Sequence, residues 1–281
     1  MLRASGFQSE YGIIGAGALS KSLIGHLPRR SRQVGPVAGV SFRVASRMAN
    51  SLRAGYAARS ADELDDAPAI LFHTPADQVR MVADLLEAAR INWKGKPIVF
   101  CDCEPSAALR ERFRLLGAST AVARQFGMAG SVMVEGMAPA LTCAHRIARE
   151  LRLKPIEIAA DTSDLFGAAI TLATGALTPL VHRAASLLRA TGLRDQEAVR
   201  IAAALFEQTV QAYGHSGRQS WNWHVRKPEA ERMEAEIDAV PELFRGLFRQ
   251  LIVSGFDDFE KHSEVARALR SAAGSVPAAR I

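Results

Sequence analysis

The sequence predicts an α/β Rossmann domain with a doubly wound, mostly parallel sheet, followed by an all-α C-terminal domain. Short apolar runs alternate with amphipathic helices from Tyr11 to about Ala159, which is the pattern of strand–helix units in a parallel sheet. Beyond Asp161 only long stretches with helical spacing follow. The predicted division is a flexible tail over 1–10, an α/β domain over 11–160, an all-helical domain over 161–265, and a flexible tail over 266–281.

The stretch YGIIGAGALSKSLIGHL, from Tyr11 to Leu27, predicts a strand, a tight glycine turn and a helix. It contains most of the dinucleotide fingerprint G-x-G-x-x-G/A, with Ser20 at the third small position. Free N–H groups and the dipole at a helix N-terminus attract anions, so we expect this turn to hold a pyrophosphate. The predicted contacts are Gly15, Ala16, Gly17, Ala18 and Leu19. The alternative is a structural glycine turn in an α/β domain that binds no nucleotide.

The remaining elements follow from apolar periodicity. Further strands are predicted at 37–41, 69–73, 97–102, 120–123, 132–135 and 154–159. Helices are predicted between them at 43–53, 58–66, 79–86, 107–116 and 138–151, and in the second domain at 164–191, 195–214, 229–240 and 241–262.

The end of the second predicted strand indicates which cofactor the domain takes. An NAD site usually places a carboxylate there, but this chain has Ser41 and Arg43, with Arg47 one turn later. A hydroxyl and guanidinium groups suit a 2′-phosphate, because arginine pairs with phosphate in a charged fork. We therefore expect NADP(H) rather than NAD(H). The alternative is that these arginines are ordinary solvated residues at the start of a helix.

Ligands of open α/β sheets bind at the carboxyl ends of the strands. His73, Thr74 and Pro75 follow the strand AILFH, so we expect them beside the nicotinamide ribose. His73 is a candidate proton donor, and the alternative is a wall residue at a strand end.

A substrate pocket is expected between Thr74-Pro75, Gln125-Phe126 and one face of the first long helix. That face carries Thr171, Thr174 and Thr178, whose hydroxyls could donate to a substrate carboxylate. The alternative is that these hydroxyls bond to helix carbonyls four residues earlier. The candidate catalytic residues are His73, Thr174 and Thr178, and the candidate substrate contacts are Gln125, Phe126 and Thr171.

Composition narrows the classes of partner. The chain has 281 residues, a formal net charge of +6 and 6% aromatic residues, and it lacks the basic runs interleaved with aromatics that are typical of nucleic-acid binding. Cys101, Cys103 and Cys143 lack zinc-pair spacing and indicate free thiols in a reducing cytoplasm, with no metal site. The apolar run 166–181 is interrupted by threonines, glycine and proline, so we expect a buried core helix rather than a membrane span.

The plan of a glycine-rich Rossmann unit followed by a helical tail resembles the 6-phosphogluconate-dehydrogenase-like superfamily. The segment GALTPLVHRAASLLRATGLRDQEAVRIAAALFEQTVQAYGHSG is similar to the paired dimerisation helices of pyrroline-5-carboxylate reductase. It also resembles related Rossmann-like proteins with an uncharacterised helical C-terminal domain. The reductases' Gly-Ser-Gly-Pro turn and their Ser-Pro-Gly-Gly-Thr-Thr loop have no counterpart here. No lysine lies between Asp161 and Gly217, where hydroxyacid dehydrogenases of the superfamily carry one.

These observations lead to three hypotheses. The first is an NADPH-dependent reductase acting on a C=N or C=O bond of a small, carboxylate-bearing substrate. The others are a nicotinamide-nucleotide-binding protein without turnover, and a hydroxyacid or alcohol dehydrogenase on the same scaffold. The two long apolar helices further predict a homodimer formed through them.

Overall fold

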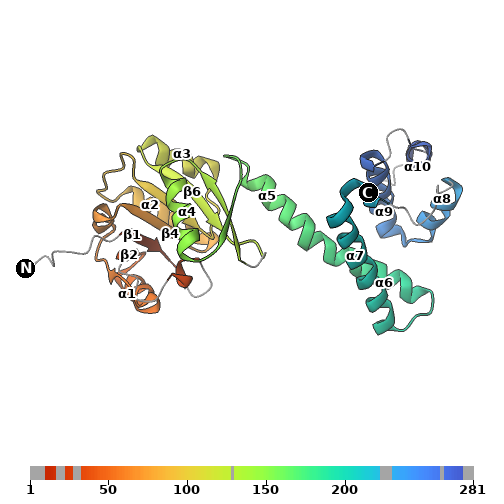
Figure 1. Cartoon of the computed structure of the whole chain (residues 1–281), viewed down its shortest axis with the longest axis horizontal. Helices are drawn as coiled ribbons and strands as arrows, with labels where there is room; N and C mark the ends of the chain where they lie inside the picture. The colour runs from red at the N-terminus through yellow and green to blue at the C-terminus, as the bar shows by residue number, and fades with distance from the viewer. Residues whose placement is uncertain are drawn as a thin grey trace, which may run out of the picture. The chain divides into compact units, whose positions relative to one another are not determined.

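The computed structural model describes residues 10–16, 23–27, 33–127, 130–221, 230–259 and 263–274. The chain divides into two compact units, Met1–Ile170 and Thr171–Ile281, the first α/β and the second helical (Figure 1). The first unit ends later than the boundary expected near residue 160. The reason is that Phe166 packs edge-on against Phe126 of the same unit, with ring centroids 5.1 Å apart.

The first unit is built on an eight-stranded sheet with the order β3-β2-β1-β4-β5-β6-β7-β8. Every neighbouring pair is parallel except β6 and β7. This doubly wound arrangement confirms the predicted fold class. The strands are β1 (Tyr11–Gly15), β2 (Val34–Gly39), β3 (Tyr56–Ala57), β4 (Ala69–His73), β5 (Pro97–Cys101), β6 (Ser119–Arg124), β7 (Ser131–Gly136) and β8 (Lys154–Glu157).

Helices cover both faces of this sheet (Figure 1). Successive strand residues face opposite sides, so Ile13 belongs to one buried cluster and Ile14 to the other. The first cluster includes α1 and α4, and the second includes α2 and α3. The helices of this unit are η1 (Ile24–His26), α1 (Phe42–Leu52), η2 (Ala61–Asp66), η3 (Ala76–Gln78), α2 (Val79–Glu87), α3 (Ala107–Leu115), α4 (Ala140–Glu150) and α5 (Ser163–Ile170).

Of the segment in which a helix is expected after the glycine turn, only the residues from Leu23 to Leu27 are described. Residues 17–22 lie outside the described residues, and the part that follows is the short 3-10 helix η1. Leu23, Ile24 and Leu27 are buried in the core, as their helical spacing predicts. This end of the segment therefore packs against the sheet through its apolar side chains.

In the second unit, the regular secondary structure of the described residues from Leu177 onward is entirely helical, with loops between the helices. They are α6 (Leu177–Ala190), α7 (Asp195–Ser216), η5 (Gly217–Ser220), α8 (Ala230–Ala239), α9 (Glu242–Phe259) and α10 (Glu264–Gly274). α6 and α7 pair as a helical hairpin (Figure 1). A small core joins α8, α9 and α10 through Met233, Ile237, Ile252, Phe256, Ala266 and Leu269.

The helix predicted at 164–191 runs over Ser163–Ala190, with the π-helix η4 (Thr171–Ala176) between α5 and α6. A proline at 179 has no N–H to donate to the carbonyl four residues earlier, which favours the wider π pattern just before it. Two candidate threonines, Thr171 and Thr174, lie in this π-helix. Such segments are frequent at functional sites.

The expectation of a buried core helix at 166–181 is wrong for the single chain. Leu165 is 73% exposed and Leu172 is 71% exposed. By length and composition alone, Ser163–Ala190 could cross a membrane, with a mean hydropathy of 1.5 in a window that is 0% buried. An apolar helix that its own chain does not cover needs another explanation, which is developed below.

The expectation of a flexible tail from residue 266 is also wrong over its described part. Residues 264–274 form α10, with Ala266 and Leu269 buried against the neighbouring helices. The alanine-rich composition indicated a frayed end. However, Ala266 and Leu269 are three positions apart, so they share one helix face and pack against α8 and α9.

Glycines of α9 provide a matched test of the packing in the second unit. Trp221 stacks on Phe259, with ring centroids 4.8 Å apart, and a Cβ at Gly255 would lie 2.6 Å from Trp221 Cη2. A Cβ at Gly246 would meet nothing within 4 Å. Gly246→Ala should stabilise the protein by about 0.5–1 kcal/mol through helix propensity. Gly255→Ala should be less stable than Gly246→Ala by about 1–3 kcal/mol because the indole is displaced.

Chemical denaturation of both variants measures this difference. Equal stability of the two variants would contradict the packing of Trp221 against α9.

Candidate active site

Strand ends from the middle of the sheet create the candidate site. β1, β4, β5 and β6 are parallel neighbours, so their carboxyl ends lie along one edge. Gly15 pairs directly with His73 across β1 and β4. Asp102 and Gln125 follow β5 and β6 at the same edge. The structure thus brings predicted residues from three separate segments together, and adds Asp102.

Gly15 ends β1 in a position where no side chain fits. An added Cβ would lie 2.3 Å from the carbonyl oxygen of His73 and 3.0 Å from Met48 Cε. The residue must therefore be glycine for β1 and β4 to pair up to their ends. Ala16 follows this residue and is half-buried, whereas Gly17, Ala18 and Leu19 lie outside the described residues.

His73 is half-buried at the end of β4, and its Nδ1 lies 2.9 Å from the carbonyl oxygen of Cys101. A carbonyl oxygen only accepts hydrogen bonds, so Nδ1 carries a hydrogen and donates it. Nε2 is therefore the ring nitrogen that can take up or release a proton. The hydrogen bond to β5 also holds the orientation of the ring.

Thr74 and Pro75 continue the chain from His73. Thr74 is 2% exposed, and its hydroxyl has no hydrogen-bond partner among the described residues. An unpaired buried hydroxyl is costly, so this position at the strand ends favours a polar ligand nearby. Pro75 precedes the 3-10 helix η3 and is exposed.

Asp102 links two separate segments of the site and was not among the predicted site residues. It has a left-handed backbone with φ of 55°. Its carboxylate accepts from the Leu23 amide at 2.6 Å and from the Gln125 amide at 3.2 Å. The sequence signal was present, because a polar residue directly follows the apolar strand PIVFC, but its partners lie 79 and 23 residues away.

The loop after β6 carries the predicted substrate contacts Gln125 and Phe126. Gln125 is exposed, and Phe126 packs edge-on against Phe166 of α5. Arg124, at the end of β6, forms an ion pair with Glu104, which follows β5. This end of the site therefore combines aromatic surface with a paired positive and negative charge.

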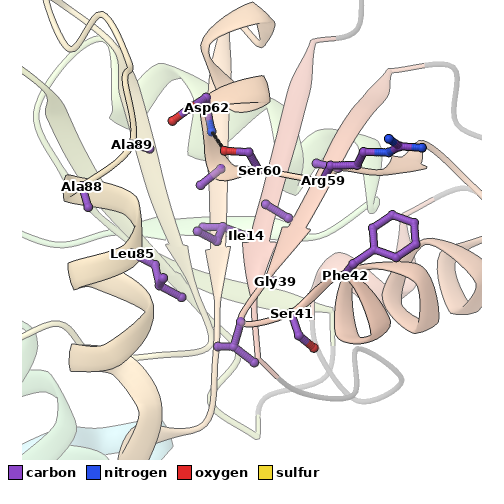
Figure 2. A pocket seen from close by; sticks show the side chains of 14 residues that line it. Ile14, Gly39, Ser41, Phe42, Arg59, Ser60, Asp62, Leu85, Ala88 and Ala89 are labelled. Carbon is purple, nitrogen blue, oxygen red and sulfur yellow. Dashed lines mark hydrogen bonds between the residues drawn. The ribbon is translucent and has the colours of Figure 1, made fainter.

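A cavity of about 320 Å³ lies beside the ends of β1 and β2 (Figure 2). This volume is within the usual range for small-molecule sites. Ser41 lines it and caps α1, with its hydroxyl accepting from the Val44 amide at 3.3 Å. The lining residues are Ile14, Ala38, Gly39, Val40, Ser41, Phe42, Ala58, Arg59, Ser60, Ala61, Asp62, Leu85, Ala88 and Ala89.

Of the arginines near this cavity, Arg59 lines it, whereas the predicted Arg43 and Arg47 do not. Both predicted arginines are exposed on α1. Arg59 follows β3, which is only two residues long and shows no periodicity that could reveal it as a strand. Without that strand, nothing in the sequence placed Arg59 beside Ser41.

The three candidate threonines belong to the second compact unit. Thr171, Thr174 and Thr178 are exposed within that unit. The Thr178 hydroxyl donates to the Thr174 carbonyl at 3.3 Å, which is the back-bonding alternative stated above.

The first unit fits a dinucleotide on three observations of its own geometry. The strand pairing at Gly15 leaves no space for a side chain, the buried Thr74 hydroxyl has no partner among the described residues, and the cavity beside β2 is lined by a hydroxyl and a guanidinium. Among the described residues, no group of three or more His, Cys, Asp or Glu side chains could hold a metal ion.

Comparison with solved structures finds the same fold in several other proteins. An imine reductase from Aspergillus terreus in complex with NADPH4 superimposes with a TM-score of 0.67 at 15% identity, covering 96% of each chain. A reductive aminase from Aspergillus terreus in complex with NADPH and ethyl levulinate has a TM-score of 0.62 at 13% identity, covering 94% of this chain and 99% of its own.

An imine reductase from Myxococcus stipitatus in complex with NADP+ has a TM-score of 0.58 at 17% identity, covering 94% of each chain. Residues 131–251 match the profile of a domain of unknown function, DUF2520. No curated protein sequence matches the chain.

The two hydrogen bonds of Asp102 can be tested by a variant of the same shape. Asp102→Asn keeps one acceptor oxygen and turns an NH₂ group toward the second amide, so one backbone N–H loses its partner. We expect unfolding to become easier by about 1–3 kcal/mol. Asp84→Asn is the control, because Asp84 forms an exposed pair with Arg112 at 2.9 Å and should change stability by less than about 0.5 kcal/mol.

Denaturant titration of the two variants compares these effects. A loss for Asp102→Asn no larger than that for the control would show that the carboxylate does not hold the two segments.

Proposed function

We propose that this protein is an NADPH-dependent oxidoreductase that reduces a C=N or C=O bond of a small, carboxylate-bearing substrate. The observation that carries the proposal is the carboxyl edge of the sheet. There the strand end at Gly15, which carries no side chain, lies next to His73, and a cavity lined by a serine hydroxyl and an arginine lies beside the end of β2. The names of the similar structures, which include imine reductases and a reductive aminase in complex with NADPH, support the same class.

In this proposal, different residues of the first unit contact different parts of the cofactor. Gly15 and Ala16 lead into the turn that would hold the pyrophosphate, Ser41 lies at the adenosine end, and Thr74 and Pro75 border the nicotinamide ribose. Arg43 and Arg47 are exposed on α1 and lie outside the lining of this cavity. When bound, the nicotinamide supplies the hydride to the carbon of the reduced double bond.

His73 is the proposed proton donor. Its Nδ1 is committed to the Cys101 carbonyl at 2.9 Å, so a proton would pass from Nε2 to the nitrogen or oxygen of the reduced bond. Gln125 and Phe126 are proposed to contact the substrate. An iminium is already electrophilic and needs little acid assistance, so a site with one histidine is better suited to C=N than to C=O reduction.

A binding protein without turnover is the second candidate. The absence of lysine between Asp161 and Gly217 favours it over a hydroxyacid dehydrogenase, because a dehydrogenase needs a strong acid or base at the substrate oxygen. Such a protein would bind NADPH and leave every imine and keto acid unchanged.

The proposed function predicts NADPH oxidation with cyclic imines or keto acids, and tighter binding of NADPH than of NADH. His73→Asn retains a donor for the Cys101 carbonyl and lacks Nε2, so we expect turnover to fall by about 10²-fold or more while NADPH affinity is kept. Fluorescence titration and steady-state kinetics measure the two quantities. Unchanged turnover in His73→Asn would remove the assigned role, and a protein that ignores both nucleotides would contradict the proposed function.

We also propose a homodimer in which a second copy of the chain covers the apolar surface of helices α5, α6 and α7. Leu165, Leu172 and Val210 are exposed in the single chain. On α9, Leu243, Leu247 and Leu251 form an exposed stripe with a spacing of four residues. A second copy of the chain explains the uncovered Ser163–Ala190 run without a bilayer, and its π segment with threonines and a glycine suits a protein interface.

Leu172→Glu tests the dimer. Because a charge inside an apolar interface is costly, we expect the variant to shift toward a monomer in light scattering at micromolar concentration. Leu115→Glu is the control, because Leu115 is 80% exposed on α3 of the first unit. A wild-type monomer, or wild-type protein that requires detergent to stay in solution, would contradict the proposed dimer.

We place the protein in a reducing compartment such as the cytoplasm. Cys101, Cys103 and Cys143 are free and buried. Burial raises the pKa of all three thiols, and that of Cys103 to about 12, so they are unreactive residues of the core.

A further inference from the structure

We infer that Arg59 is the residue that selects a phosphorylated adenosine, in preference to Arg43 and Arg47 on α1. The inference rests on the proposed function, because it concerns the adenosine end of the proposed cofactor. It starts from the cavity beside β2, whose lining includes Arg59 and excludes the other two arginines.

The backbone brings Arg59 and Ser41 to the same edge of the sheet. β2 and β3 are parallel neighbours, with Pro36 paired to Tyr56 and Val37 paired to Ala57. By this register Arg59 is level with Gly39, and Ser41 lies two residues further along the chain. Both Arg59 and Ser41 line the cavity.

Several backbone contacts hold this segment in place. The Ala58 amide donates to the Val37 carbonyl at 2.9 Å. The Arg59 amide donates to Glu63 Oε1 at 2.6 Å, and Ser60 forms a capping box with the same glutamate at the start of η2. The Arg59 backbone is held in place, so ligand binding would restrict only the Arg59 side chain and would cost little conformational entropy.

The charges around the cavity leave the Arg59 guanidinium available. In the part of the chain that the structure describes, it forms no ion pair or hydrogen bond. Asp62, an acidic residue of the lining, accepts from the Arg90 amide at 2.9 Å, and this contact holds the pKa of Asp62 below its ordinary value. Figure 2 shows the Arg59 side chain on the side of the cavity where the Phe42 ring lies, with the Asp62 carboxylate turned the other way.

A guanidinium with no anionic partner among the described residues and a serine hydroxyl in the lining of the same cavity match the donors that a phosphate monoester requires. Phe42 is 55% exposed at the same rim and offers a ring face to a base. The chemistry of this end is thus that of an adenosine carrying a 2′-phosphate. Arg43 and Arg47 point from a helix that begins at Phe42 and contribute no lining atoms.

The test uses the full chain and two probes that differ only in the 2′-phosphate, adenosine 2′,5′-bisphosphate and adenosine 5′-monophosphate. Calorimetry on the wild type should show tighter binding of the bisphosphate. Arg59→Gln should reduce that preference by roughly tenfold to a hundredfold, and Arg59→Lys should restore part of it through charge alone. Arg43→Gln and Arg47→Gln are the matched variants and should keep the preference.

The outcomes separate this inference from the proposed function. Loss of the preference only in Arg59→Gln, with an unchanged melting temperature, supports the inference. A preference retained in Arg59→Gln and lost in Arg43→Gln or Arg47→Gln overturns it. Binding of both probes without discrimination also overturns it but leaves a nucleotide site. Failure of the wild type to bind either probe overturns the inference and the proposed function together.

Discussion

The close pairing of β1 with β4 is the constraint on which the rest of the site depends. Gly15 approaches the His73 carbonyl so closely that an added Cβ would lie 2.3 Å from it. This approach lets the two strands end side by side at the carboxyl edge. Ala16 and His73 stand at the strand ends that this pairing sets, and Asp102 follows β5, the next strand along the sheet. A side chain at Gly15 would push apart the strands that create the site.

Asp102 also positions parts of the site, because it connects segments that follow different strands. A single carboxylate accepts amides from the segment after the glycine turn and from the loop after β6. The first segment belongs to the proposed cofactor side and the second to the proposed substrate side. Because one carboxylate accepts hydrogen bonds from both segments, it fixes their positions relative to each other.

Much of the fold follows from local pattern because the strands are buried on both faces and the helices are amphipathic. Apolar composition alone predicts strands at the positions of Ile13, Ile14, Ile70 and Phe72, and all four side chains are buried. The failures have equally local causes. β3 is too short to show a pattern. The run Ser163–Ala190 is apolar enough to read as core, although its own chain leaves it exposed.

The sequence by itself determined that a strand ends in a glycine turn, that His73 and Thr74 follow another strand, and that a helical region comes last. Only the tertiary structure decided which side chains share a surface. It placed Arg59, and neither Arg43 nor Arg47, in the lining of the cavity that Ser41 also lines, and it joined Asp102 to Leu23, 79 residues away. The physical reason is that periodicity records which face of an element is buried, whereas the partners across a sheet edge depend on strand order and register.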